Sequence, residues 1–349
     1  MATTVTRPSG PRAIELPTPR GPLSERLFTT LRDAPGTPLD LPSAAQLAAI
    51  GDPLADDDLQ LALYVAYELH YSEIAEVDAD WEWDPGQLAF RAALERPFEA
   101  ALRRLVGEVE EVDPAQVGAT LQALVAADDG PPLSRRIETR ADVEQVREFL
   151  IHRSAYQLKE ADPHSWAIPR LAGGPKAALV EIQTDEYGGG DGERIHAVLF
   201  AKAMGALGLD PAYGVYLDRL PAITLATVNL MSLCGLHRRL RGAIVGHLAA
   251  FEMTSSLPNR RYGNGLRRLG CGPEATDFFD EHVTADAVHE NIAAWDLAGG
   301  LAAAEPQLAG DIVFGARALL AIEARWAAHL LGAWDDGVSS LRPPRRSPL

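Results

Sequence analysis

Residues 186–196 have the sequence EYGGGDGERIH, in which glycines stand among acids and a histidine closes the stretch. Three interpretations compete: a phosphate-binding loop, a plain turn and part of a metal site. A phosphate loop supplies a lysine and opens a helix whose N-terminus attracts anions, whereas the carboxylates here would repel a phosphate. The stretch is therefore either a turn or part of a metal site.

The composition narrows the class of function. The chain has 349 residues, of which 47% are hydrophobic, enough to bury one large core or two smaller ones. Its net charge of −17 disfavours nucleic-acid backbones and anionic membranes, which need clustered Lys and Arg. We find no apolar run typical of a signal peptide or a membrane helix. We therefore expect a cytoplasmic protein that acts on a small molecule or a metal, without a nucleic-acid or membrane partner.

Hydrophobic periodicity predicts an all-α fold. Apolar residues recur at spacings of three and four, whereas the alternation typical of strands is scarce. The expected helices are 43–50, 57–75, 86–107, 114–127, 142–160, 193–207, 222–256, 275–298 and 310–333. The range 222–256 can hold two helices or one that kinks near Gly235, and Pro258 is expected to stop the helix that follows.

The distribution of helix breakers predicts how the chain is divided. Residues 1–22 and 337–349 are rich in Pro, Ser, Thr or Arg, which predicts tails that are disordered or loosely draped on the fold. A stretch of acids, glycine and prolines at 128–132 divides an N-terminal helical region, 23–130, from a C-terminal bundle, 131–336. The two regions could still share one core.

Several acids and histidines stand where a core helix should be apolar. Glu252 lies on an apolar stripe, where an unpaired carboxylate would be costly. His282, Asp286 and His289 are spaced four and three residues apart, which places them on one helix face. The alternatives are a helix-end carboxylate that reaches water and an acidic face with satisfied histidines.

The opening stretch contains a further pair of this kind. Glu193 and His196 would point the same way on a helix, as inward-facing ligand pairs do in di-iron bundles. Glu186 would join that stripe if the helix continued through the glycines, each of which costs about 1 kcal/mol relative to Ala. Glu160 follows another predicted helix. A solvated face or an exposed helix end is the alternative for each of these residues.

The cysteines limit the chemistry of any metal site. Cys234 and Cys271 suggest neither a disulfide framework nor a thiolate zinc site, so a metal must use nitrogen and oxygen ligands. Carboxylates and imidazoles suit Fe(II) and Mn(II). Such residues occur in four separate predicted helices, and this combination favours a metal site.

The order of these residues resembles that of the haem-oxygenase-like di-iron oxidases and oxygenases, a family of iron-containing redox enzymes. That family carries a Glu on a first core helix, then Glu-x6-Glu-x2-His, then a Glu, then His-x3-Asp. The matching residues here are Glu160, Glu186, Glu193, His196, Glu252, His282 and Asp286. The resemblance covers about residues 140–335, and residues 67–71 (YELHY) and 81–85 (WEWDP) also resemble the N-terminal helical portion of such proteins. It implies a haem-oxygenase-like seven-helix bundle, with an additional N-terminal helical region.

The resemblance also implies a cofactor. Two Fe(II) ions, with Mn as an alternative, would be bound by these seven residues, and O2 would be the cosubstrate. His289, one turn beyond Asp286, either supports a ligand from behind or replaces one. The glycines after Glu186 would let this residue approach or leave the metals. A homodimer through the N-terminal helices and an external electron donor are further partners that the resemblance allows.

The implied activity is the O2-dependent oxidation of a small metabolite. The family performs N-oxygenation of an amine or guanidine and oxidative C–H or C–C cleavage of an amino or fatty acid. Arg153, Lys159 and Arg194 are candidates to pair with a substrate carboxylate. Two alternatives stay open: an iron-binding or iron-storage helical protein without substrate chemistry, and an acidic helical scaffold without metal.

Overall fold

The computed structural model describes residues 13–344, apart from the side chains of residues 286–288. Over this range the chain forms helices, turns and loops, and its β pairing is limited to one isolated bridge between Ile14 and Ile74. The all-α prediction is confirmed.

Helices of three types follow one another along the chain. The α-helices are α1 (Pro22–Leu31), α2 (Ala44–Ala48), α3 (Asp57–Glu68), α4 (Pro85–Val106), α5 (Val117–Ala126), α6 (Leu133–Thr139), α7 (Val143–Gln157), α8 (Asp162–Ser165), α9 (Gly173–Glu186), α10 (His196–Ala206), α11 (Ala222–Leu236), α12 (Arg241–Arg268), α13 (Pro273–Asn291), α14 (Gly300–Ala304) and α15 (Ala309–Asp335). The 3-10 helices are η1 (Ala79–Trp83), η2 (Pro114–Gln116), η3 (Ile168–Arg170), η4 (Gly188–Gly190), η5 (Leu217–Arg219), η6 (Arg238–Leu240) and η8 (Pro306–Leu308), whereas η7 (Ile292–Gly299) is a π-helix.

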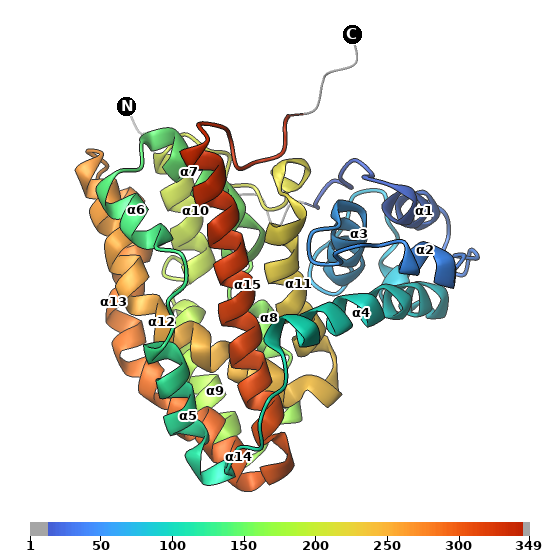
Figure 1. The fold of residues 1–349 in the computed structure, drawn as a ribbon. Helices are drawn as coiled ribbons and strands as arrows, with labels where there is room; N and C mark the ends of the chain where they lie inside the picture. The colour runs from blue at the N-terminus through green and yellow to red at the C-terminus, as the bar shows by residue number, and fades with distance from the viewer. Residues whose placement is uncertain (1–12, 345–349) are drawn as a thin grey trace.

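The helices form an upright bundle with a lobe beside it (Figure 1). The bundle contains the long helices α12, α13 and α15, and helices α1–α4 form the lobe. Helix α12 packs against α13, α15 and α6, while α11 packs against α3 and α15 packs against α4. One buried apolar cluster runs through both parts, from Leu27 in α1 to Leu330 in α15. The regions on the two sides of residue 130 therefore share one core.

Glycine allows the two central helices to touch through their backbones. A Cβ atom on Gly246 of α12 would lie 1.8 Å from the carbonyl oxygen of Ile312. A Cβ atom on Gly315 of α15 would lie 1.9 Å from the carbonyl oxygen of Ala243. Only residues without a side chain fit at these two positions, and the contact sets α12, which carries Glu252, against the centre of the bundle.

Parts of the expected tails pack on the bundle. Ile14 is buried, and the backbone N–H of Thr18 donates to a carboxylate oxygen of Asp218 at 2.8 Å. Ser340 is buried as well, and its hydroxyl donates to Glu148 at 2.7 Å. Residues 13–22 and 337–344 therefore depart from the expectation of disorder, because each segment brings buried side chains and hydrogen bonds to the bundle. The rest of the expected tails, 1–12 and 345–349, lies outside the described residues.

The structure decides between two alternatives for one helix range and corrects two other expectations. The range 222–256 holds two helices rather than one kinked helix, and the guanidinium of Arg170 donates to the carbonyl of Leu236 at 2.8 Å where α11 ends. Pro258 does not stop α12, which continues to Arg268 while it packs against neighbouring helices. Helix α9 lies outside the helices that hydrophobic periodicity predicts, and it begins with Gly-Gly-Pro at 173–175, residues that commonly interrupt a helix. Proline is tolerated in the first turn of a helix, where its missing N–H has no partner to lose.

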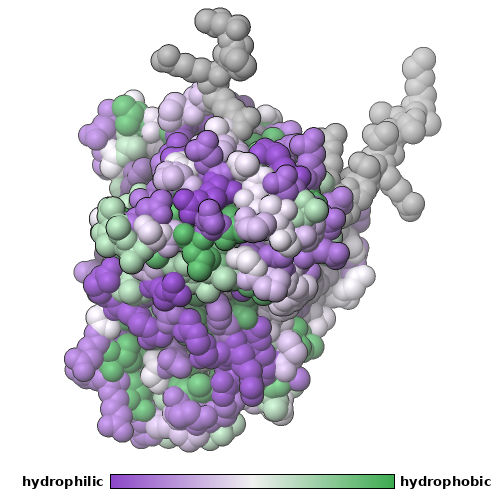
Figure 2. Space-filling view, turned by 90° about the vertical axis from the view of Figure 1, so that its right-hand side faces the viewer, coloured by the Kyte–Doolittle hydropathy of each residue, from purple (hydrophilic) through white to green (hydrophobic). Residues whose placement is uncertain are grey.

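Polar and charged residues dominate the face of the molecule shown in Figure 2. Its apolar residues form small separate groups, the clearest of them near the middle of that face. Among the described residues, no helix combines the length and the apolar character that crossing a membrane requires. The apolar side chains of the long helices are instead directed into the common core.

Candidate metal centre

Buried carboxylates and imidazoles converge in two groups inside the bundle. The first group consists of Glu160, Glu186, His196 and His282, and the second of Glu186, Glu252 and His289. In each group, every residue contributes a nitrogen or oxygen atom within 4.8 Å of the atoms of the others. Glu186 belongs to both groups, so it would be a shared ligand if each group held an ion.

Glu160 lies in the turn between α7 and α8 rather than at an exposed helix end, and it is only 4% exposed. The next residue, Ala161, has a φ of 75°. This left-handed conformation costs a residue with a side chain roughly 1–2 kcal/mol. The side-chain amide of Gln183 donates to the carbonyl of Ala161 at 2.8 Å and holds the turn against α9. The surrounding structure therefore fixes an otherwise unfavourable turn, and Glu160 lies within it.

The glycines of the opening stretch form the turn that brings two ligands together. Helix α9 ends at Glu186, α10 begins at His196, and all three glycines of η4 have positive φ angles. A Cβ atom on Gly188 would lie 2.7 Å from the backbone of Arg194, so the turn closes tightly. Across it, Nδ1 of His196 lies 2.9 Å from Oε2 of Glu186.

The structure does not bring Glu193 into either group. Its side chain is 82% exposed and pairs with Lys202 at 3.1 Å. The prediction placed Glu193 and His196 one turn apart on a common helix, but Glu193 lies in the turn before α10. The helical spacing on which that prediction depended is therefore absent. For Asp286, the backbone lies in α13 and the side chain is outside the described residues.

His289 lies in the second group, as the alternative ligand that the sequence allowed. Its Nδ1 lies 3.4 Å from Oε2 of Glu252, and its Nε2 lies 2.9 Å from Oδ2 of Asp185. A carboxylate on the far nitrogen commonly orients a metal-binding imidazole. Sequence reasoning missed this role of Asp185, because its partner lies 104 residues away and no local pattern joins the two.

His282 has a similar arrangement in the first group. Its Nδ1 lies 2.8 Å from the carbonyl oxygen of Phe278, one helical turn earlier, and is placed to donate to it. Its Nε2 lies 3.5 Å from Oε1 of Glu160. A neutral imidazole that donates through Nδ1 presents a lone pair on Nε2. The ring therefore turns a ligand atom toward the other members of its group.

Many atoms of these residues lack a hydrogen bond. Both carboxylate oxygens of Glu160, Oε2 of Glu186, Nδ1 of His196 and Nδ1 of His289 are buried and make no well-oriented hydrogen bond among the described residues, and their close contacts are ion pairs within the two groups and with one another. Buried polar atoms are costly to leave unpaired, so such a concentration calls for a ligand. Oxygen and nitrogen atoms that converge in this way fit divalent iron or manganese.

The pKa values of these groups also reflect the buried negative charge, since those of Glu160, Glu186 and His289 are raised. Burial raises the pKa of Glu160, and burial together with repulsion from Glu252 raises the pKa of Glu186 to about 8. Burial and the neighbouring His282 lower the pKa of His196 to about 4, which keeps this ring neutral at pH 7. For His289, burial lowers the pKa, but Glu252 and Asp185 outweigh it and raise the pKa to about 9. Protons therefore partly compensate the carboxylates in the absence of a metal.

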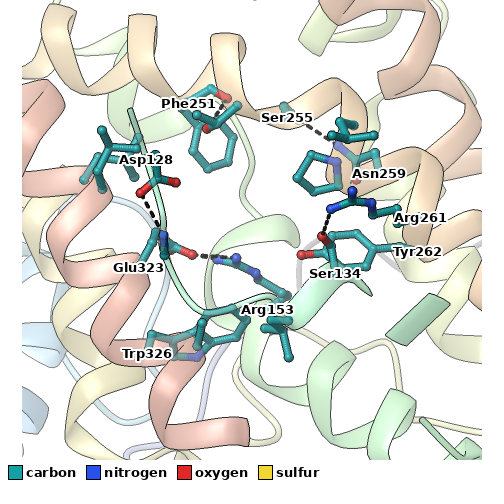
Figure 3. A pocket seen from close by; sticks show the side chains of 18 of the residues that line it. Asp128, Ser134, Arg153, Phe251, Ser255, Asn259, Arg261, Tyr262, Glu323 and Trp326 are labelled. Carbon is teal, nitrogen blue, oxygen red and sulfur yellow. Dashed lines mark hydrogen bonds and ion pairs between the residues drawn. The ribbon is translucent and has the colours of Figure 1, made fainter. Parts of the chain in front are cut away.

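A cavity of about 460 Å³ lies beside these groups, between α12, α15 and the segment around α6 (Figure 3). Phe251 and Ser255 line both this cavity and the small space between the ligand residues. The ring of Phe278, which also lines the cavity, has its centroid 4.3 Å from that of His282. The cavity therefore lies next to the candidate metal centre, and the aromatic side chains of Phe251 and Phe278 stand between the two.

Charged residues in the cavity are mostly paired with one another (Figure 3). Arg153 donates to the two carboxylate oxygens of Glu323 at 2.9 and 2.7 Å, and its guanidinium lies 3.9 Å from the ring centroid of Trp326. Arg261 donates to the hydroxyl of Ser134 at 3.2 Å. The lining thus combines aromatic surfaces with a neutralised ion pair.

Only one of the three basic residues predicted to meet a substrate lines this cavity. Arg153 does so. Arg194 instead pairs with Asp277 at 2.8 Å, near the surface. Lys159 forms a buried ion pair with Glu68 of the lobe.

Comparisons with known proteins agree with this arrangement. A family described as iron-containing redox enzymes matches residues 147–324, just over half of the chain. A comparison with curated proteins found no match. Two crystal structures of a CADD-like protein of unknown function from Nostoc punctiforme PCC 73102 are similar. The structure at 2.00 Å resolution has 18% identity and a TM-score of 0.50, covering 62% of this chain and 96% of the other. The structure at 1.35 Å has 18% identity and a TM-score of 0.49, with coverages of 64% and 96%.

At this identity the likeness to the solved structures concerns the fold, which is haem-oxygenase-like. The family match covers α7 to α15, including every residue of the two groups. The chain therefore belongs to the family of iron-containing redox enzymes.

Proposed function

We propose that this protein is a non-haem di-iron oxidoreductase that uses O2 to oxidise a small metabolite. The observation that carries the proposal is the position of Glu186 in two buried groups of carboxylates and imidazoles. A cavity for a small molecule adjoins both groups. The iron-containing family supplies the choice of metal.

The residues present fit two ions. One would be held by Glu160, Glu186, His196 and His282, and the other by Glu186, Glu252 and His289. Two bound irons that share a carboxylate would supply redox chemistry with O2. The chain's own part is to orient the ligands: Asp185 fixes the ring of His289, and the carbonyl of Phe278 fixes that of His282.

The cavity supports a substrate that carries hydrogen-bond donors. Gln157 lines the cavity and its buried Oε1 has no hydrogen-bond partner among the described residues, so a turn of this side chain would offer an acceptor to a bound N–H or O–H group. The carboxylate of Glu323 also lines the cavity, with both oxygens already accepting from Arg153. Arg153 is already occupied by Glu323 and is therefore a poor anchor for a free carboxylate. The acceptors favour a substrate that carries an N–H donor, as an amine, a guanidine or the ammonium group of an amino acid does, over a fatty acid, and 460 Å³ lies in the usual range of ligand pockets.

The metal ligands can be separated by variants that change a carboxylate to an amide. We expect the parent to bind about two Fe(II) ions per chain under anaerobic conditions. Glu186→Gln should weaken both ions, because this residue is shared, whereas Glu160→Gln and Glu252→Gln should each weaken one. The matched control is Glu193→Gln, which should bind as the parent does because Glu193 is exposed. Anaerobic titration with metal analysis measures this, and loss of metal from Glu193→Gln but not from Glu186→Gln would contradict the assignment.

The metal-free protein should lose stability as the pH rises from 7 to 9. Glu186 and His289 have folded pKa values raised to about 8 and about 9, above their unfolded values of 4.5 and 6.5. The folded state therefore holds protons that the unfolded chain has released, and this stabilisation is lost as these groups deprotonate. We expect a decrease on the order of 2 kcal/mol, measured by chemical unfolding at several pH values.

Two comparisons make the pH experiment specific. The metal-loaded protein should not show the decrease, because the cations replace the protons, and Glu186→Gln should show a smaller one. A metal-free parent whose stability is unchanged or increases over this range would show that Glu186 and His289 are not the protonated pair that the structure indicates.

Reaction with O2 tests the proposed activity. The Fe(II)-loaded protein would be mixed with O2 in a stopped-flow instrument, alone and with amines, guanidines, amino acids and fatty acids. We expect one nitrogen-bearing class to accelerate O2 consumption and to be oxidised over many turnovers. A single stoichiometric oxidation of the iron, unaffected by every compound, would instead indicate the iron-binding or iron-storage alternative.

A further inference from the structure

A buried ion pair connects the N-terminal lobe to the metal centre. Glu68, the last residue of α3, is fully buried, and its carboxylate contacts the ammonium of Lys159, whose side chain is 4% exposed. Lys159 immediately precedes Glu160 in the chain. The lobe therefore holds the side chain of Lys159, the residue next to the candidate ligand Glu160.

Aromatic residues enclose this ion pair. The ammonium of Lys159 lies 4.2 Å from the ring centroid of Tyr71, 5.2 Å from that of Tyr64 and 5.8 Å from that of Tyr213. The hydroxyl of Tyr213 donates to Oε2 of Glu68 at 2.9 Å and lies 2.7 Å from the hydroxyl of Tyr64. Both charges thus have fixed partners, which gives Lys159 one defined direction.

The turn that carries Glu160 is held on two sides. Lys159 is anchored to the lobe, and Ala161, in its left-handed conformation, is anchored to α9 by the 2.8 Å hydrogen bond from Gln183. Between these two anchors, the carboxylate of Glu160 makes no well-oriented hydrogen bond among the described residues, and Oε1 lies 3.5 Å from Nε2 of His282. The placement of the backbone at Glu160 therefore decides whether its oxygens face the first group.

Neither stability nor substrate binding accounts well for the pair. The desolvation of two charges commonly offsets their attraction, and apolar side chains of similar volume would join the lobe to the bundle as well. Lys159 is not among the residues that line the cavity. An ion pair fixes the direction of the Lys159 side chain, and with it the course of the chain there, whereas an apolar contact would not.

We propose that Glu68 and Lys159 are positioning residues for Glu160, so that the N-terminal lobe completes the first metal group. Residue 68 lies outside the family match of 147–324. The inference rests on the proposed metal centre. It assigns the lobe a role in metal binding rather than in folding alone.

The double variant Glu68→Gln/Lys159→Met tests the proposal. Removing both charges leaves no unpaired ion, and the new amide still offers an acceptor to Tyr213, so thermal unfolding should stay close to that of the parent. Affinity for one Mn(II) or Fe(II) ion, measured by anaerobic titration calorimetry, should fall about 10- to 100-fold, as happens when the support of a ligand is removed. Affinity for the other ion should be kept.

A matched control removes a comparable ion pair elsewhere. Arg91 and Glu95 of α4 lie 3.2 Å apart, with side chains 10% and 5% exposed. Arg91→Met/Glu95→Gln makes the same two kinds of change without touching α7, and both ions should bind as in the parent. Equal loss of affinity in the two double variants would overturn the proposal, because a general loosening of the lobe would then be the cause.

Two further measurements separate positioning from a merely structural role. Added to Glu160→Gln, the substitutions at 68 and 159 should weaken metal binding no further, since both act through one ligand. Glu68→Asp keeps both charges and shortens the side chain by one methylene, so it covers the case in which the double variant does not fold. Glu68→Asp should also lower the affinity for one of the two ions.

The outcomes distinguish this inference from the proposed function. If the parent binds two ions and a folded Glu68→Asp or double variant binds both with parental affinity, the positioning role is wrong while the metal centre stands. If the parent and the Arg91→Met/Glu95→Gln control bind no metal at all, the metal centre itself fails and the inference falls with it.

Discussion

The candidate metal centre buries three carboxylates, Glu160, Glu186 and Glu252, with few hydrogen-bond donors around them. The arrangement of the surrounding helices depends on this constraint. Glu160 and Glu186 have oxygens without well-oriented hydrogen bonds, and burial together with the nearby charge of Glu252 raises the pKa of Glu186 to about 8. Isolated carboxylates are rarely buried at such cost unless a cation compensates them. Protons on Glu186 and His289 compensate this charge only in part, because both oxygens of Glu160 still lack a well-oriented hydrogen bond among the described residues.

The scaffold can be understood as the means of holding these residues together. The glycine turn joins the ends of α9 and α10, and thereby sets Glu186 beside His196. The glycine contact between α12 and α15 sets Glu252 at the centre of the bundle. The lobe and α9 hold the strained turn of Glu160 from opposite sides. Each ligand is thus placed by backbone geometry, and the ligand side chains themselves make few hydrogen bonds.

The parts of this picture that the sequence predicted are those that depend on helical periodicity alone. Periodicity predicted the all-α fold. It also identified Glu252 and His282 as candidate ligands, because both lie on long helices, α12 and α13, at positions that should be apolar. Glu193 was misplaced because a Glu-x-x-His spacing is informative only inside a helix, and α10 begins at His196. Glu186, seven residues earlier, was identified from the Glu-x6-Glu-x2-His order of the family, although the helix that ends at this residue was not predicted.

Tertiary contacts decided what sequence reasoning left out. Nothing local indicates that Asp185 would meet His289, 104 residues away, or that Glu68 would meet Lys159. The same is true of residues 13–22 and 337–344, whose composition is that of tails but whose buried side chains find partners on distant helices. Such residues are recognisable only after the fold has brought their partners together.

Anomalous X-ray diffraction from crystals loaded with Fe(II) or Mn(II) without oxygen would test the central claim most directly. The account predicts two metal peaks, one among Glu160, Glu186, His196 and His282 and one among Glu186, Glu252 and His289, with the carboxylate of Glu186 touching both. A single peak, peaks outside these groups, or two peaks that Glu186 does not share would contradict it.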